Sequence, residues 1–364
     1  MVTGATTSPA RRARRDHVPG THPVPGTPVV FTGTVRRVLV LGGTGWLGSA
    51  VARAALADGA QVVCLARGES GDVPDGARLV RADRTAPGAY DALTGDWDEV
   101  VEITSEPALV AGALDALADR AQHWTLVSTV SVYARHDVPG ADESAELVEP
   151  RDLTAYPDAK VAAERATAAR LGDRVLVARP GLIVGPGDPS DRFGYWPARL
   201  HRGGRVLVPA PEGRFVQVID VDDLAAWLVA AGRAGVTGAV NAVGTPVTWA
   251  DFLALVQDVT AVDVETVAVD DATLLAHDVR HWAGPRSLPL WIPVADAGFA
   301  QRDGSAYRAA GGTLRPLRET TARALADEVA RGIDRPRRSG LTAAEERAVL
   351  GAVRAASRTG GAWR

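Results

Sequence analysis

The chain is poor in several residue types, and these shortages exclude whole classes of protein and site. Cys64 is the only cysteine among 364 residues, so an internal disulfide and a cysteine-based zinc site are both impossible. The seven histidines show no metal-ligand spacing, and we therefore expect no metal site. No run of 18 apolar residues occurs, so we expect no membrane span.

The charge and the start of the chain narrow the class further. A formal net charge of −4 argues against a nucleic-acid surface as the main function, which leaves a small-molecule substrate as the expected partner. The first residues include arginines but no apolar stretch behind them, unlike a secretory signal. Together with the single cysteine, this favours a protein of the reducing cytoplasm.

Lysine is the scarcest cation. Lysine and arginine together number 40, yet Lys160 is the only lysine in the chain. It lies four residues after Tyr156, one of only five tyrosines. Lys160 is either a leftover on a solvated helix or a position that requires a compact ammonium group and rejects a planar guanidinium.

Short Val/Leu runs alternate with amphipathic helical stretches from residue 35 to about residue 180. This rhythm predicts an α/β fold, namely a doubly wound parallel Rossmann sheet covered by helices on both faces. We also expect a helix over 86–95, and a last helix that opens on a capping box formed by Thr342 and Glu345. The expected parts are a flexible tail (1–34), a Rossmann domain (35–182 and 218–245), a smaller, discontinuous mixed α/β substrate lobe (183–217 and 246–335), and a C-terminal helix and tail (336–364).

A glycine-rich turn follows the first predicted strand. In "VLVLGGTGWLGSAV", Gly42, Gly45 and Gly48 have the spacing G-x-x-G-x-x-G between a strand and a helix. Glycines there let the backbone approach a pyrophosphate, whose charge then rests on the helix N-terminus. We predict a dinucleotide site that also involves Trp46 and Leu47; the plain alternative is a glycine-rich βα turn.

The end of the second predicted strand indicates which dinucleotide is bound. It reads Leu65, Ala66, Arg67, without the acid that usually holds the ribose 2′-hydroxyl of NAD. A guanidinium there suits a 2′-phosphate, so we predict that NADP(H) is preferred over NAD(H). Asp83, at the end of the third strand, is expected to accept from the adenine amino group. The alternatives are a solvated Arg67 and an Asp83 that only forms a turn.

Three motifs together resemble the extended branch of the short-chain dehydrogenase/reductase superfamily. They are the glycine turn, "VSTVSVY" at 127–133 and "YPDAK" at 156–160, and the resemblance covers about residues 36–245. By motif position it implies Thr129, Tyr156 and Lys160 as catalytic residues, with Tyr156 and Lys160 also touching the cofactor. The segment "ARPGLIVGPGD" resembles the strand end beside the nicotinamide, which implies a cofactor contact at Pro180.

The chemistry of these side chains agrees with that assignment. Tyr156 and Lys160 share one helix face because they are four residues apart. A nearby ammonium favours the phenolate, so we expect Lys160 to lower the pKa of Tyr156. Thr129 can donate to a substrate oxygen; alone, it would be read as a buried strand threonine.

The stretch "DPSDRFGYW" follows the cofactor motifs and is rich in polar and aromatic groups. We predict that it frames the substrate, or else forms a surface turn. The candidate residues are Asp188, Asp191, Arg192, Tyr195 and Trp196.

The sequence lacks residues that mark two subgroups of this family, and this limits the reactions that we expect. Thr129 is not followed by the Asp-Glu pair of the dehydratases. The arginine of nucleotide-sugar epimerases falls on Val216 here, with Arg214 two residues away. The leading prediction is therefore an NADP(H)-dependent oxidoreductase of the carbonyl reductase or alcohol dehydrogenase type. The alternatives are an epimerase of a sugar or sugar-nucleotide and a silent dinucleotide sensor. Extended members often dimerise through the helix of Tyr156, whose outer face here is compatible with a monomer and with a homodimer.

Overall fold

The computed structural model describes residue 1 and residues 35–360. The predicted flexible tail, apart from Met1, and the last four residues lie outside the described residues. Among the residues that are described, no helix combines the length and the apolar character that crossing a membrane requires.

A seven-stranded sheet forms from the Val/Leu runs, with the order β11-β6-β5-β4-β1-β2-β3 and every neighbouring pair parallel. The order reverses between β1 and β4, which is the switch point where open α/β sheets bind ligands. The strands are β1 (Arg37–Leu41), β2 (Gln61–Ala66), β3 (Arg78–Arg81), β4 (Trp97–Glu102), β5 (Ala121–Val127), β6 (Val175–Pro180) and β11 (Gly238–Ala242).

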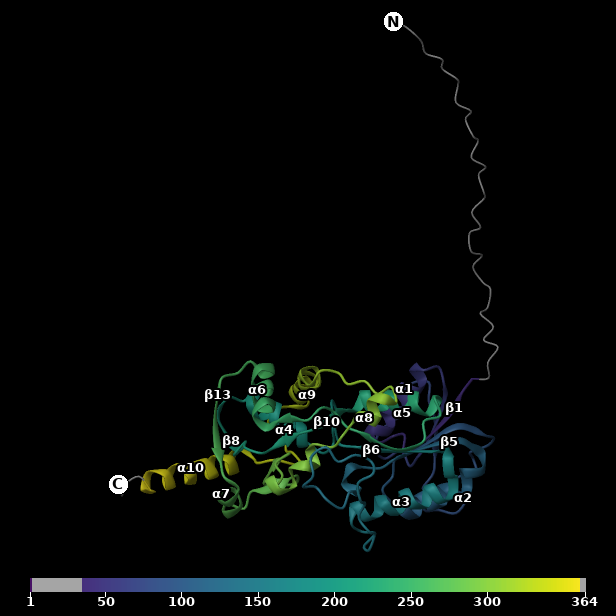
Figure 1. The fold of residues 1–364 in the computed structure, drawn as a ribbon, viewed down its shortest axis with the longest axis horizontal. Helices are drawn as coiled ribbons and strands as arrows, with labels where there is room; N and C mark the ends of the chain where they lie inside the picture. The colour runs from purple at the N-terminus through teal and green to yellow at the C-terminus, as the bar shows by residue number, and fades with distance from the viewer. Residues whose placement is uncertain (2–34, 361–364) are drawn as a thin grey trace. The chain divides into compact units, whose positions relative to one another are not determined.

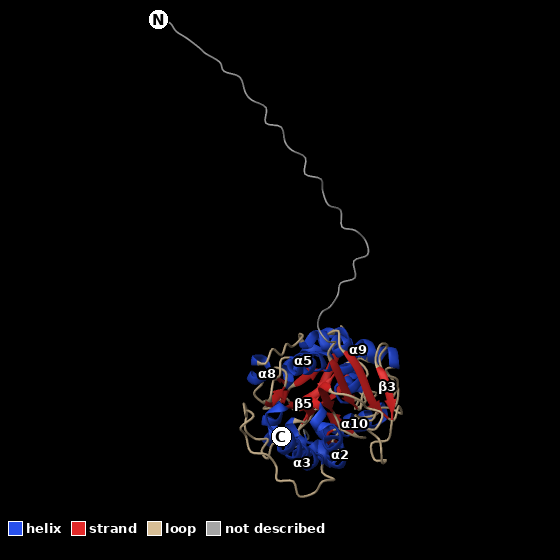
Figure 2. Ribbon diagram, turned by 90° about the vertical axis from the view of Figure 1, so that its right-hand side faces the viewer, coloured by secondary structure: helices blue, strands red, loops and turns tan. Residues whose placement is uncertain are grey.

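Helices cover both faces of this sheet (Figures 1 and 2). On one face, α1 (Trp46–Ala57) packs beside α5 (Val221–Arg233); on the other, α2 (Pro107–Leu117) packs beside α3 (Tyr156–Leu171). Each face has its own apolar core, because successive strand side chains point to opposite sides. The predicted doubly wound Rossmann sheet is confirmed.

The helix expected over 86–95 does not form. Single turns take its place, with Asp91 N donating to Gly88 O at 3.0 Å and Leu93 N donating to Tyr90 O at 3.0 Å. Gly88 has a φ of +75°, which interrupts a right-handed helix two residues after it could begin. The β3–β4 connection is therefore made of turns.

A second group of elements forms the smaller lobe. Four two-stranded sheets and the remaining helices surround an aromatic core that includes Phe193, Trp196, Trp249 and Phe252. Its strands are β7 (Leu182–Val184), β8 (Gly204–Pro209), β9 (Phe215–Val216), β10 (Val218–Asp220), β12 (Val247–Thr248), β13 (Val264–Val269), β14 (Arg280–Trp282) and β15 (Ser287–Pro289). Its helices are α4 (Arg192–His201), α6 (Trp249–Thr260), α7 (Asp271–Ala276), α9 (Leu317–Arg331) and α10 (Ala343–Gly360).

Two C-terminal segments lie elsewhere than the predicted parts suggest. Helix α10 packs on the lobe, where the Glu346 carboxylate accepts from Arg199 Nε at 2.5 Å and from Leu207 N at 3.0 Å. Its predicted capping box is confirmed, with Glu345 N donating to Thr342 Oγ1 at 3.2 Å. Helix α8 (Ser305–Ala309) instead belongs to the sheet, because Tyr307 joins one of its cores.

Candidate active site

The glycine turn is as tight as its sequence implies. Gly42 has a φ of +94°, and its N–H donates to Leu65 O at 2.9 Å, which ties the turn to β2. Gly48 lies in the first turn of α1, where an added Cβ would stand 2.2 Å from Gly42 O. Backbone geometry therefore requires glycine at both positions.

This turn opens onto a hollow that we call the loop cavity, of about 440 Å³. Its wall includes Gly42, Thr44 and Gly45, and no side chain of the described residues caps the N-terminus of α1. The first N–H groups of a helix bind anions well when no side chain takes them. The residues therefore fit the pyrophosphate of a dinucleotide.

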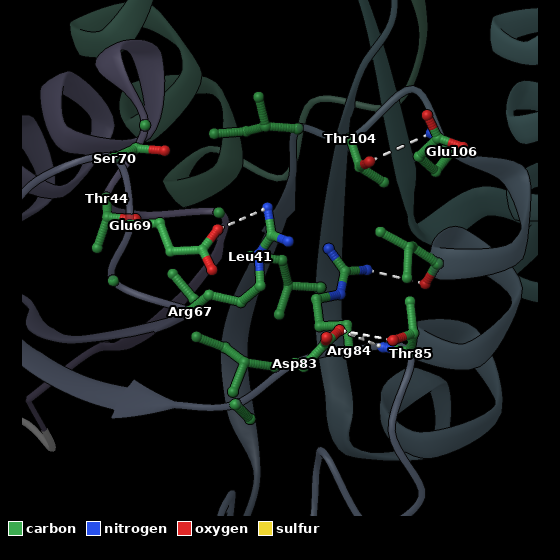
Figure 3. Close-up of a pocket in the computed structure, with 18 residues that line it drawn as sticks. Leu41, Thr44, Arg67, Glu69, Ser70, Asp83, Arg84, Thr85, Thr104 and Glu106 are labelled. Atoms are coloured by element: carbon green, nitrogen blue, oxygen red, sulfur yellow. Dashed lines mark hydrogen bonds and ion pairs between the residues drawn. The ribbon is translucent and has the colours of Figure 1, made fainter.

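Arg67 forms an ion pair on the wall of the loop cavity with Glu69, a residue that sequence reasoning missed (Figure 3). Arg67 Nη2 lies 3.2 Å from Glu69 Oε2, and both side chains are mostly exposed. The acid expected at the end of β2 in an NAD site was sought up to Arg67, whereas Glu69 stands two residues later. The cavity thus offers a guanidinium and a carboxylate together.

Asp83 lies on the wall of the same cavity and also forms a turn. Its Oδ1 accepts from Thr85 N at 2.9 Å and from Thr85 Oγ1 at 2.7 Å. These hydrogen bonds, and then the charge of Arg67, hold the pKa of Asp83 below its usual value. The two interpretations of Asp83 are compatible, since one of its oxygens is bound by Thr85 and the residue still lines the cavity.

A second hollow, of about 400 Å³, adjoins the first. We call it the tyrosine cavity. Ile103 lines both hollows, so they are neighbours at the carboxyl ends of the strands. The predicted residues that line the tyrosine cavity are Trp46, Leu47, Thr129, Tyr156, Lys160, Pro180, Asp188 and Arg192.

Tyr156 and Thr129 meet in this cavity. Thr129 lies two residues after the end of β5, and its Oγ1 accepts from Ser131 N at 3.1 Å. Tyr156 is the first residue of α3 and is 49% exposed. Desolvation by the surrounding protein raises the pKa of its phenol, while a hydrogen bond with Thr129 and the charge of Arg192 act in the opposite direction. The phenol is therefore protonated at neutral pH.

Lys160 is 2% exposed and uses its ammonium group differently from the prediction. Its Nζ donates to Val127 O at 2.6 Å, Thr104 O at 2.9 Å and Ile103 O at 3.3 Å. In this structure the pKa of Tyr156 is raised and the charge that acts on the phenol is that of Arg192, so the lowering expected from Lys160 and an oxidised nicotinamide stays a prediction for the cofactor complex. The three N–H groups of one ammonium nitrogen donate to three carbonyls, and no single nitrogen of a planar guanidinium has three N–H groups.

Burial of this ammonium should make stability depend on pH. Desolvation lowers the pKa of Lys160 from 10.5 to about 8, against the raising effect of Glu102 and Glu164. Between these pH values the unfolded chain holds a proton that the folded chain has released, so the free energy of unfolding rises with pH. Relative to Lys160→Met, we expect the wild type to gain about 3 kcal/mol across the window. Urea unfolding of both proteins at each end of this pH window measures the two free energies of unfolding. If their difference is the same at both pH values, the prediction is wrong.

Three predicted substrate residues are not brought to either cavity. The Asp191 carboxylate is held by Arg335 and by Arg338 N, the latter at 2.8 Å. Tyr195 and Trp196 are buried in the lobe core, and Trp196 Nε1 donates to Pro289 O at 2.8 Å. The reason is that this stretch forms α4, which packs against α6 and α9 and buries its aromatic residues.

Other residues complete the tyrosine cavity without a motif to mark them. Trp282 ends β14 and Phe299 lies in a 3-10 segment of the lobe, and their rings meet edge to face with centroids 5.3 Å apart. The one available signal was their aromatic character, which Tyr195 and Trp196 share. Among the described residues, no group of three or more acidic, histidine or cysteine side chains could hold a metal ion.

Arg214, the residue closest to the pyrophosphate-binding position of the epimerases, is buried in the lobe. Its guanidinium forms an ion pair with Asp271, and its Nε donates to Ala210 O at 2.8 Å. Nη1 donates to Ile292 O. Arg214 therefore holds lobe segments together and does not line the tyrosine cavity.

Comparison with known proteins agrees with this architecture. Residues 38–244 match the model of the NAD dependent epimerase/dehydratase family. A 2'-dehydrokanamycin reductase of Streptomyces kanamyceticus is 27% identical over 301 residues, covering 77% of this chain and 82% of that protein.

Solved structures share the fold at lower identity. A UDP-N-acetylglucosamine 4-epimerase from Bacillus cereus has a TM-score of 0.61 at 16% identity, over 83% of this chain and 98% of that chain. A UDP-glucuronic acid 4-epimerase from Bacillus cereus in complex with NAD has a TM-score of 0.61 at 14% identity, over 81% of this chain and 99% of that chain.

Proposed function

Because the chain belongs to the NAD dependent epimerase/dehydratase family, we propose that it is an NADP(H)-dependent carbonyl reductase. Its substrate is a ketone or aldehyde on a small or medium polar molecule. The family and the similarity to a reductase support an NAD(P)-dependent enzyme of the extended short-chain dehydrogenase/reductase type. The observation that carries the proposal is that Tyr156 and Thr129 line one cavity, which adjoins the hollow at the glycine turn.

The residues of the tyrosine cavity divide the chemistry among them. A bound dihydronicotinamide supplies the hydride that the carbonyl carbon receives. Thr129 and Tyr156 hold the carbonyl oxygen, and Tyr156 gives it the phenolic proton as negative charge develops there. The raised pKa of Tyr156 favours this direction, since the phenol carries its proton at neutral pH. Lys160 fixes the backbone at Ile103, Thr104 and Val127, and the first and last of these line the tyrosine cavity.

The reductase is favoured over the two alternatives for separate reasons. An epimerase of a nucleotide-sugar would use an arginine at the pyrophosphate, and Arg214 is bound to Asp271 instead. A silent sensor has no use for a phenol and a hydroxyl that line the same cavity beside the glycine turn. The similarity to a named reductase supports the same choice.

Absorbance of the reduced nicotinamide tests the proposal when a panel of polar ketones and aldehydes is added. We expect net consumption of the reduced cofactor with formation of an alcohol. Product without net consumption would instead identify an epimerase. Tight cofactor binding with no product from any sugar or ketone would identify a sensor.

The proposed NADP(H) preference depends on the Arg67–Glu69 pair. A charged hydrogen bond is worth about 1.5–3 kcal/mol when buried and less at this exposed site, so we expect an effect of about tenfold. Arg67→Glu should shift the ratio of the NADPH and NADH dissociation constants toward NADH by that factor. Glu69→Gln should shift it the other way, because Arg67 then loses its competing partner.

Titration calorimetry with both cofactors gives these ratios. Arg78→Glu is the matched control, because Arg78 is exposed at the start of β3 and does not line the loop cavity. If Arg67→Glu and Arg78→Glu leave the same ratio as the wild type, Arg67 does not read the 2′-phosphate.

A further inference from the structure

Arg192 has an arrangement that the proposed reaction does not yet use. It opens α4 and lines the tyrosine cavity together with Tyr156. Its guanidinium lies over the Trp282 ring, 5.0 Å from the centroid, and its Nε donates to Ser190 Oγ at 3.1 Å. Within residues 35–360, neither terminal nitrogen of Arg192 has a hydrogen-bond or ion-pair partner, which leaves up to four N–H donors for a ligand.

The neighbouring acid does not neutralise this group at close range. Asp188 is buried on the same cavity wall, but Ser190 N and Ser190 Oγ already donate to its two oxygens, at 2.8 and 2.9 Å. No ion pair within 4.0 Å joins Asp188 to Arg192 in the described part of the chain. The nitrogens of Arg192 are not among the buried side-chain atoms that lack a partner in the described part of the chain, so they face the open cavity, where a ligand can reach them.

Two residues that position Arg192, namely Asp191 before it in the chain and Trp282 under its guanidinium, have left-handed backbone conformations. Asp191, directly before it, has a φ of +58°, and its carboxylate is clamped by Arg335 and Arg338 N. Trp282, whose ring lies under the Arg192 guanidinium, has a φ of +69°. Its backbone N–H donates to Trp291 O at 2.9 Å. Left-handed backbone at residues other than glycine persists where surrounding contacts impose it, and it is concentrated at functional sites.

We propose that Arg192 determines substrate specificity by binding oxygen acceptors on the carbon next to the reacting carbonyl, with Trp282 as the aromatic wall. This inference rests on the proposed reductase function. A carboxylate or a hydroxyl could supply the oxygens, since the guanidinium fork donates to both. An ammonium group at the same position is rejected by like charge. The effect of Arg192 on the phenol agrees with its closeness to the reacting end of the cavity.

Four phenyl ketones that differ only beside the carbonyl test the proposal: phenylglyoxylate, 2-hydroxyacetophenone, acetophenone and phenacylamine. For the wild type we expect kcat/KM to be at least tenfold higher for phenylglyoxylate or 2-hydroxyacetophenone than for the other two. Whichever of phenylglyoxylate and 2-hydroxyacetophenone has the higher kcat/KM shows whether Arg192 binds a carboxylate or a hydroxyl. Arg192→Met should abolish the preference, while Arg192→Lys, which keeps the charge without the fork, should retain part of it.

Arg202→Met is the matched control, because Arg202 ends the same helix, is paired with Asp334 3.6 Å away and does not line the cavity. It should keep the wild-type preference. The proposal is overturned if acetophenone or phenacylamine is reduced as well as the oxygen-bearing ketones, or if Arg192→Met keeps the preference while remaining folded by circular dichroism.

A binding experiment separates this inference from the proposed reaction. Calorimetric titration with mandelate, which carries both oxygen groups and has no carbonyl to reduce, needs no turnover. Mandelate binding that is at least tenfold weaker in Arg192→Met than in the wild type and in Arg202→Met supports Arg192 even if no ketone is reduced. Equal binding by all three proteins overturns the role of Arg192 and leaves the reductase proposal standing.

Discussion

Tyr156→Phe should lower turnover by about 10²–10⁴-fold, the usual contribution of a positioned general acid. The change removes one hydroxyl and keeps the ring, so the wall of the tyrosine cavity is preserved. The glycine turn and the Arg67–Glu69 pair are distant in sequence and untouched, so the dissociation constant of NADPH should change less than threefold. Single-turnover kinetics and calorimetry, on the same preparation, measure the two quantities.

Tyr195→Phe is a control of the same chemistry. Tyr195 is buried in the lobe core and lines neither cavity, so its hydroxyl should be irrelevant to turnover. If both variants retain wild-type turnover, Tyr156 is not the proton donor. If both lose it, the loss reports disturbed folding, and their thermal midpoints will have fallen together.

Gly48→Ala should weaken NADPH binding by at least tenfold. The added Cβ would stand 2.2 Å from Gly42 O and 2.9 Å from Gly43 Cα, both of them backbone atoms that no rotamer change can move. The first turn of α1 must then shift away from the glycine turn, and overpacking of this kind costs about 1–3 kcal/mol. Calorimetry measures the dissociation constant, and the thermal midpoint separates lost affinity from lost fold.

Gly351→Ala serves as the matched control. Gly351 is exposed in α10, and a Cβ there would meet nothing within 4 Å. Alanine in an exposed helix interior is favourable by up to about 1 kcal/mol relative to glycine, so this variant should be as stable as the wild type or more so. Unchanged NADPH affinity in Gly48→Ala would mean that the turn does not cradle the pyrophosphate.

The sheet and the glycine turn were predictable because their signals are local. Continuous Val/Leu runs between amphipathic stretches are typical of a parallel sheet. The glycine spacing between the first strand and the first helix predicts the tight turn between them. The helix over 86–95 failed for a local reason too, since Gly88 adopts a left-handed φ within its first turn.

The substrate side could not be predicted in this way. Trp196 and Trp282 are both tryptophans near polar residues, yet one fills the lobe core and the other lines the cavity. Which one is exposed to a ligand depends on how α4, α6 and α9 pack, and that is set by contacts distant in sequence. Helix spacing likewise places Lys160 near Tyr156 but does not reveal the three carbonyls that the ammonium group binds.

The Lys160 ammonium also has a consequence for engineering. Two of the carbonyls that it binds belong to Ile103 and Thr104, and both residues line the loop cavity as well. A substitution that moves this backbone to accommodate a different adenosine moiety would therefore pull on the helix that begins with Tyr156. Coenzyme preference and catalytic rate in this protein should consequently be optimised as one problem.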